Sequence, residues 1–139
     1  MTARDPGFVG GLRARVQGEV REGEALSRYS TYRIGGPATV LLPAGPEDVA
    51  AAVVHASAHG VPWFPVGLGS NLLFPDEGLS ALVIRMGKGL DRFERSGTTV
   101  RVGAGLPGSR LAPGALAWAR PTSVPGAAPR SPQALRRRD

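Results

Sequence analysis

Residues 38–66 read ATVLLPAGPEDVAAAVVHASAHGVPWFPV, and this stretch decides the fold class. Ala38–Leu42 is an apolar, partly β-branched run that predicts a buried strand. Pro46 is followed by two acids, a pattern typical of a first helical turn, and Gly60 is expected to end the helix. Val61–Val66 then predicts a returning strand. A strand, a helix and a second strand in this order favour a β-α-β unit with parallel pairing.

The residues before this unit predict a helix and a further strand. Residues 1–19 are expected to contain an N-terminal helix, because Pro6 is followed by apolar residues at helical spacing. Tyr29–Ile34 is rich in aromatic and β-branched residues, and we predict a strand there that ends at Gly35-Gly36.

The residues after the unit predict further short strands. They are expected at Leu72–Phe74, Ala81–Ile84, about Leu90–Glu94 and Thr98–Val102, with turns at Pro75–Gly78 and Ser96-Gly97. The predicted fold class is therefore α+β, with about six or seven short strands, one or two helices and a mixed sheet that contains the β-α-β unit.

The composition excludes several classes of protein. The chain of 139 residues has the usual size of one domain, and the lack of cysteine excludes disulfide scaffolds, cysteine zinc sites and thiol nucleophiles. The net charge of +6 lies mainly in residues 110–139, with six arginines and one acid, whereas residues 1–109 hold 11 basic and 10 acidic residues. We therefore expect no nucleic-acid partner. No apolar run approaches the ~20 residues of a membrane span, so we also expect no membrane partner and a cytoplasmic location.

The strongest local motif is the glycine loop within Val66–Leu73, which reads VGLGSNLL and is predicted to connect two apolar strands. Its glycines allow several backbone N–H groups to point one way, and Ser70 and Asn71 add side-chain hydrogen bonds, which suits a phosphate or pyrophosphate. A plain turn is the alternative interpretation. The loop is neither a Rossmann fingerprint, because no helix follows it, nor a P-loop, because Gly-Lys-Ser/Thr is missing.

Two other glycine turns could approach a ligand closely. They are Ile34-Gly35-Gly36-Pro37 and Gly103-Ala104-Gly105, and each is equally consistent with a turn that ends a strand. Three glycine-bearing strand ends would form a better cofactor cradle than one, if the fold brings them to one edge.

Other candidate residues have simpler interpretations. His55 and His59 lie four residues apart on the predicted helix, but without a third ligand nearby we expect a solvated helix end and no metal site. The adjacent acids Asp76 and Glu77 stand between proline and glycine, which is typical of a turn rather than of acid–base chemistry. No Ser/His/Asp arrangement can be proposed.

Several of these motifs together resemble one enzyme family. The residues that carry the resemblance are Ser30–Ala38, Pro46–Val49, Gly67–Leu73, Asp76–Gly78, Val83-Ile84 and Val102–Gly105, in this order. They are similar to UDP-N-acetylenolpyruvoylglucosamine reductase, also called UDP-N-acetylmuramate dehydrogenase. The resemblance covers about residues 20–109, with Ser30 and Leu68 as mild departures.

The resemblance implies an FAD-binding domain of the p-cresol-methylhydroxylase type, truncated before the family's catalytic residues. The pyrophosphate of FAD would lie on the loop formed by Gly67, Leu68, Gly69, Ser70, Asn71 and Leu72. The family reduces the enolpyruvyl group of a UDP-sugar with NADPH through FAD, to make UDP-N-acetylmuramate for peptidoglycan. No catalytic residue of the family can be placed on this sequence, so we expect a chain that binds FAD and does not turn over alone.

The last part of the chain differs from the rest in amino-acid composition. Residues 110–139 are rich in alanine, proline, arginine and glycine, and we expect them to be disordered or translated out of frame. The expected organisation is a helical segment at 1–19, a partial FAD-binding domain at 20–109 and this tail. An alternative hypothesis is a stand-alone flavin- or nucleotide-binding module whose basic tail recruits a partner.

Overall fold

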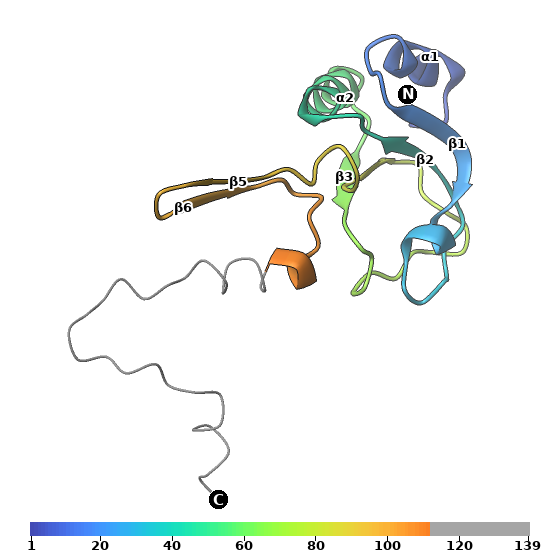
Figure 1. Ribbon diagram of the computed structural model, residues 1–139. Coiled ribbons are helices and arrows are strands. Elements are labelled where there is room, and N and C mark those ends of the chain that lie inside the picture. The colour runs from blue at the N-terminus through green and yellow to red at the C-terminus, as the bar shows by residue number, and fades with distance from the viewer. Residues whose placement is uncertain (112–139) are drawn as a thin grey trace, which may run out of the picture. The chain divides into compact units, whose positions relative to one another are not determined.

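A mixed sheet of four strands, in the order β1-β2-β4-β3, forms the centre of the fold (Figure 1). The computed structural model describes residues 1–111, and the predictions for the tail beyond them lie outside the described residues. The elements in chain order are α1 (Pro6–Arg13), β1 (Glu19–Ala25), a 3₁₀ helix (Leu26–Tyr29), β2 (Pro37–Leu42), α2 (Pro46–Ala58), β3 (Trp63–Val66), β4 (Leu82–Arg85), β5 (Phe93–Ser96) and β6 (Thr99–Val102). Residues 1–108 form one compact unit.

The order of strand, helix and strand predicted for residues 38–66 is confirmed, but the predicted direct pairing of the two strands is wrong, because a later strand is inserted between them. Strands β2 and β3, joined through α2, both run parallel to β4, which lies between them, so that Val83 faces both Val40 and Phe64. Strand β1 pairs with β2 antiparallel and forms the other edge of the sheet. The three parallel strands therefore direct their carboxyl ends to one edge of the sheet.

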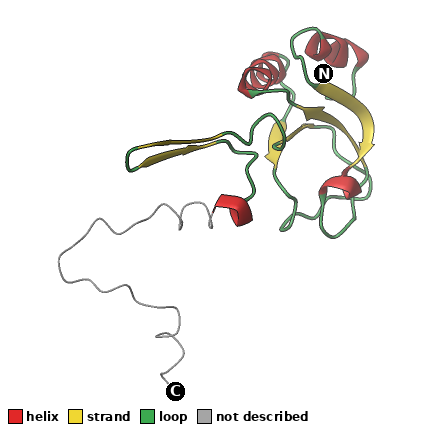
Figure 2. Ribbon diagram, in the orientation of Figure 1, coloured by secondary structure: helices red, strands yellow, loops and turns green. Residues whose placement is uncertain are grey.

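The two faces of the sheet pack against different layers (Figure 2). On β4, Leu82 and Ile84 belong to the cluster under α1 and α2, whereas Val83 belongs to the opposite cluster. That second cluster contains Leu26 and Phe74, which come from the connections before β2 and before β4. Residues 26–36 and 67–81 thus form a layer of loops, called the loop layer below, on the face opposite the helices.

The alternation of β4 explains why short strands suffice here. Leu82, Val83 and Ile84 are completely buried, and burying such a side chain contributes about 1.5–3 kcal/mol. The remaining strands, β5 and β6, pair only with each other and form an antiparallel hairpin around Gly97, whose φ of +59° suits glycine.

The predicted strand at Tyr29–Ile34 is wrong. Residues 26–29 form a 3₁₀ helix and residues 30–36 form a loop in which Arg33 has a φ of 54° and Gly35 a φ of 147°, so the backbone cannot remain extended. The strand lies instead at Glu19–Ala25, whose charged residues are tolerated because they lie at the edge of the sheet.

The predicted strand at Leu72–Phe74 is also wrong, because no strand is assigned between β3 and β4. Phe74 is buried in the loop-layer cluster while Leu72 and Leu73 are exposed, so this segment does not pair with the sheet. The other predicted elements are confirmed to within a few residues. Among residues 1–111, no helix is both long and apolar enough to cross a membrane.

The buried carboxylate of Asp48 joins three parts of the fold. It accepts hydrogen bonds from the backbone N–H groups of Gln17 (2.9 Å), Gly18 (2.7 Å) and Ala44 (2.8 Å). Burial acts to raise the pKa of this carboxyl group, but the three hydrogen bonds outweigh burial and hold the pKa of Asp48 below its ordinary value. The start of β1, the end of β2 and the first turn of α2 are therefore tied to one ionised group.

Replacing Asp48 with asparagine is expected to lower the free energy of unfolding at pH 7 by about 1–3 kcal/mol, because an amide offers one acceptor atom to three donors. In the wild type, this contribution is present above the ordinary carboxyl pKa and is lost as the pH falls through the lowered folded-state pKa. Urea unfolding between pH 7 and the acid range measures both effects. Glu47→Gln, at an exposed position of the same turn, is the control and should change little. Equal stability of the two variants would contradict this role.

Candidate cofactor-binding site

The glycine loop, residues 67–73, follows the carboxyl end of β3. Gly69 lies at its centre, is buried, and has a φ of +69°. A Cβ atom at Gly69 would lie 1.8 Å from the carbonyl oxygen of Tyr29, which is far too close for two non-bonded atoms. The backbone of residues 29–30 thus packs directly on the loop, and glycine is required at position 69.

A second segment, residues 30–36, holds the loop through hydrogen bonds. The backbone N–H of Thr31 donates to the carbonyl of Gly69 (3.1 Å), and the hydroxyl of Ser30 donates to the carbonyl of Leu72 (2.9 Å). The Ser30 oxygen also accepts a hydrogen bond from the N–H of Tyr32 and is only 7% exposed. Ser30 therefore fixes the glycine loop to residues 30–32. The sequence did not indicate this role, because a strand was wrongly predicted at Tyr29–Ile34.

The glycine loop leaves its own donors free. Residues 69–72 form a tight turn, and within the part of the chain that the structure describes no backbone N–H group of residues 67–71 donates a hydrogen bond. The side chains of Ser70 and Asn71 are exposed and likewise have no hydrogen-bond partner there. A backbone N–H group in a folded protein normally pairs with a protein acceptor, water or a ligand. This donor set fits the oxygen atoms of a phosphate or pyrophosphate.

The same two segments also carry apolar side chains that face solvent. They are Tyr32 (56% exposed), Ile34 (47%), Leu68 (59%), Leu72 (37%) and Leu73 (71%), five of the nine large exposed hydrophobic residues found within residues 1–111. Apolar side chains beside unpaired polar donors are typical of a site for a ligand with both ring and phosphate groups.

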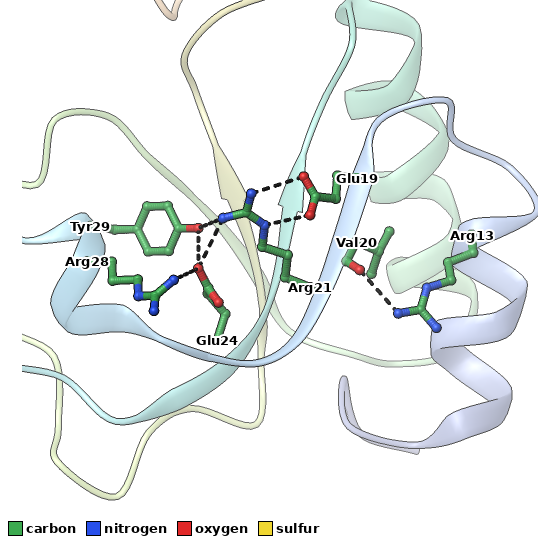
Figure 3. Close-up of polar contacts among 7 residues, drawn as sticks. All are labelled: Arg13, Glu19, Val20, Arg21, Glu24, Arg28 and Tyr29. Carbon is green, nitrogen blue, oxygen red and sulfur yellow. Dashed lines mark hydrogen bonds and ion pairs between the residues drawn. The ribbon is translucent and has the colours of Figure 1, made fainter.

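Tyr29, whose carbonyl contacts Gly69, is itself held by an ionic network (Figure 3). Its hydroxyl donates to Glu24 Oε1 (3.0 Å), and the same carboxylate contacts Arg21 (3.2 Å) and Arg28 (3.5 Å). Burial raises the pKa of the Tyr29 hydroxyl, and the neighbouring Glu24 carboxylate adds to this shift. Arg21 also pairs with Glu19 (2.8 Å), so β1 anchors the segment that contacts the glycine loop.

The second glycine turn packs against protein backbone. A Cβ atom at Gly36 would lie 2.0 Å from the carbonyl oxygen of Asp76, and the N–H of Gly36 donates to the carbonyl of Pro75 (2.9 Å). Asp76 and Glu77 lie in a turn closed by the N–H of Gly78 and the carbonyl of Pro75 (3.0 Å), and both are exposed. The turn predicted at Asp76 and Glu77 is therefore confirmed, whereas residues 34–36 do not end a strand and instead form irregular backbone that leads into β2.

The third glycine turn lines a different feature. Gly103 and Gly105 donate backbone hydrogen bonds to the carbonyls of Arg92 (2.7 Å) and Leu90 (2.9 Å). Gly103 also lines a cleft of about 540 Å³ beside the first turn of α2. The fold thus brings the first two glycine turns together in the loop layer, and the third contacts residues 87–92.

The prediction of a solvated helix end is wrong for His55. Its side chain is 4% exposed, its ring stacks on Phe8 with centroids 4.8 Å apart, and its Nε2 lies 2.9 Å from the carbonyl oxygen of Phe8. His55 therefore joins α2 to α1, whereas His59 is exposed at the helix end. Nowhere within residues 1–111 do three or more metal-ligating side chains of histidine, cysteine or acidic type gather.

Comparison with known proteins provides the chemical context for this geometry. A family model described as an FAD binding domain matches residues 37–121, which include the glycine loop. The UDP-N-acetylenolpyruvoylglucosamine reductase of Bacillus licheniformis is 46% identical over 98 residues, which is 70% of this chain and 32% of the relative. Reductases of the same name from Halalkalibacterium halodurans and Geobacter sulfurreducens are 41% and 39% identical, over 76% and 72% of this chain and 35% and 34% of the relatives. The chain spans about a third of the length of these curated relatives.

Alanine substitutions at the two glycines of the loop should differ strongly in their effect on stability. Gly69→Ala is expected to lower the free energy of unfolding by at least ~1–3 kcal/mol, because the new Cβ meets Tyr29 and the backbone conformation disfavours side chains. Gly67→Ala should change it by less than ~0.5 kcal/mol, since open space surrounds that position. Thermal unfolding of both variants without ligand measures the difference. If Gly69→Ala is as stable as Gly67→Ala, the loop does not pack on Tyr29 as described.

Proposed function

Because the chain belongs to the FAD binding domain family, with FAD as its cofactor, we propose that residues 67–72 hold the pyrophosphate of FAD. The single observation that carries this proposal is the row of unpaired backbone N–H groups in the glycine loop. Ser70 and Asn71 add donors beside them, and their free side chains fit phosphate oxygens. The Ser30 hydroxyl and the Thr31 N–H group hold this loop in place through its carbonyl groups.

The apolar side chains of the loop layer suit the ring systems of the same cofactor. Leu68 and Leu72 are exposed on the glycine loop itself, and Ile34 is exposed on the segment that the Ser30 hydrogen bond joins to it. Covering them with a flat aromatic ring removes apolar surface from water, which favours binding by about 25 cal/mol per Å². When bound, FAD supplies hydride transfer. This chain's own residues bind the cofactor and hold it in place.

We further propose that the chain corresponds to the N-terminal FAD-binding part of a UDP-N-acetylmuramate dehydrogenase, with the fold type of p-cresol methylhydroxylase. The support is the similarity to curated reductases over about 70% of this chain, together with the mixed α+β sheet. In that proposal NADPH is the co-substrate, an enolpyruvyl UDP-sugar is the substrate, and the product enters peptidoglycan synthesis in the cytoplasm. The family's catalytic arginine, serine and glutamate have no counterparts assigned in this sequence, so the chain alone does not turn over.

FAD titration of the full chain tests the location of the site. The wild type is expected to quench flavin fluorescence saturably, and Gly67→Val should bind FAD at least ~10-fold more weakly, because its side chain occupies open space at the loop. Gly7→Val is the matched control, since Gly7 also faces open space but lies in α1. Wild-type affinity in Gly67→Val would place the cofactor elsewhere, and no binding by the wild type would overturn the proposal.

A turnover assay tests the second part of the proposal. The chain mixed with FAD, NADPH and the enolpyruvyl UDP-sugar is expected to oxidise NADPH no faster than a mixture without protein, because the groups that transfer protons and orient the substrate are missing. A full-length reductase assayed in parallel is the positive control. Substrate-dependent NADPH oxidation by this chain would show that it contains a catalytic site.

A further inference from the structure

Arg85 is the last residue of β4 and carries a charge next to a largely apolar cluster. Its neighbours alternate between the two faces of the sheet, and Arg85 lies on the same face as Val83, toward the loop layer. The side chain is partly buried, and its guanidinium lies 5.9 Å from the ring centroid of Tyr29. The cation is therefore held against an aromatic ring at the carboxyl edge of the parallel strands.

The hydrogen bonds of Arg85 place it at the base of the glycine loop. Its Nη1 donates to the carbonyl of Met86 (3.2 Å) and, at 3.5 Å, toward the carbonyl of Val66. Val66 directly precedes Gly67, and its carbonyl also accepts the N–H of Met86 (2.8 Å). The guanidinium thus lies beside the residue from which the loop begins.

The charge of Arg85 is not balanced by the protein within residues 1–111. No carboxylate oxygen lies within 4.0 Å of it there, and its Nε and Nη2 donors have no hydrogen-bond partner among those residues. The carboxylate that contacts Tyr29 belongs to Glu24, and it already binds Arg21 and Arg28. A partly buried guanidinium with free donors and no acid nearby favours an anionic ligand.

We propose that Arg85 binds the phosphate oxygens of the dinucleotide, as a positively charged partner to the neutral donors of the glycine loop. This inference rests on the proposed function, because it assumes that the loop holds a pyrophosphate. A guanidinium offers parallel N–H donors that match phosphate oxygens, and the Tyr29 ring keeps its plane oriented before the ligand arrives. The residue therefore contributes to affinity for the phosphate part of FAD and not for its ring.

The test compares three ligands on the full 139-residue chain. Arg85→Met keeps an unbranched stem against Tyr29 but removes the charge, and it should bind FAD and ADP about 10- to 100-fold more weakly. Riboflavin, which lacks phosphate, should bind the variant as it binds the wild type. The salt dependence of FAD affinity should also become weaker, because one charge pair is lost. Arg101→Met, at an exposed position of β6, is the matched control and should leave all affinities unchanged.

Arg85→Lys distinguishes the contribution of the positive charge from that of the planar guanidinium group. It should restore part of the FAD and ADP affinity, because lysine keeps the charge but not the planar fork. The inference would be overturned if Arg85→Met weakened FAD and riboflavin binding equally, or if Arg85→Lys restored none of the lost FAD affinity. Arg85 would then only stabilise the structure through its hydrogen bond to Val66. If the wild type itself binds no FAD, the proposed function fails first, whereas wild-type FAD binding with an unaffected Arg85→Met refutes only this inference.

Discussion

The position of β4 between β2 and β3 is the constraint on which the rest of the structure depends. Because β3 and β4 are parallel neighbours, the chain must return from the carboxyl end of one to the amino end of the other, and here residues 67–81 do so without a helix. That connection can only run across the open face of the sheet. The glycine loop, the Pro75–Gly78 turn and the buried Phe74 all belong to this return path, and together with residues 26–36 they replace the second layer of helices that parallel sheets usually have.

The candidate site follows from how two irregular segments pack without regular pairing. Backbone approaches backbone at Gly36 and Gly69, where no side chain fits, and the Ser30 hydroxyl adds a hydrogen bond between the segments. These contacts use carbonyl groups of the glycine loop as acceptors and leave the N–H groups of residues 67–71 free. The same packing therefore makes the loop rigid and directs its unused donors to a ligand, which is the preorganisation that tight binding requires.

Some of the fold could be predicted from local sequence, because the signals there were strong and short in range. The strand, the proline-initiated helix and the returning strand of residues 38–66 were predicted nearly residue by residue. Local signals misled where tertiary contacts override propensity, as in Tyr29–Ile34, whose β-branched and aromatic residues line a loop. The opposite error concerns Glu19–Ala25, a strand rich in charged residues that an edge position accommodates.

The sequence by itself determined the fold class, the β-α-β unit, the glycine loop and the family, because each depends on residue types at fixed short spacings. Only the tertiary structure decided which glycine turns meet, that His55 packs on Phe8, and that Ser30 and Arg85 adjoin the glycine loop. The physical reason is the insertion of β4 into the sheet, a pairing between residues distant in the chain that no local pattern encodes. Once that pairing exists, groups 42 residues apart, such as the Ser30 hydroxyl and the Leu72 carbonyl, come within hydrogen-bond distance.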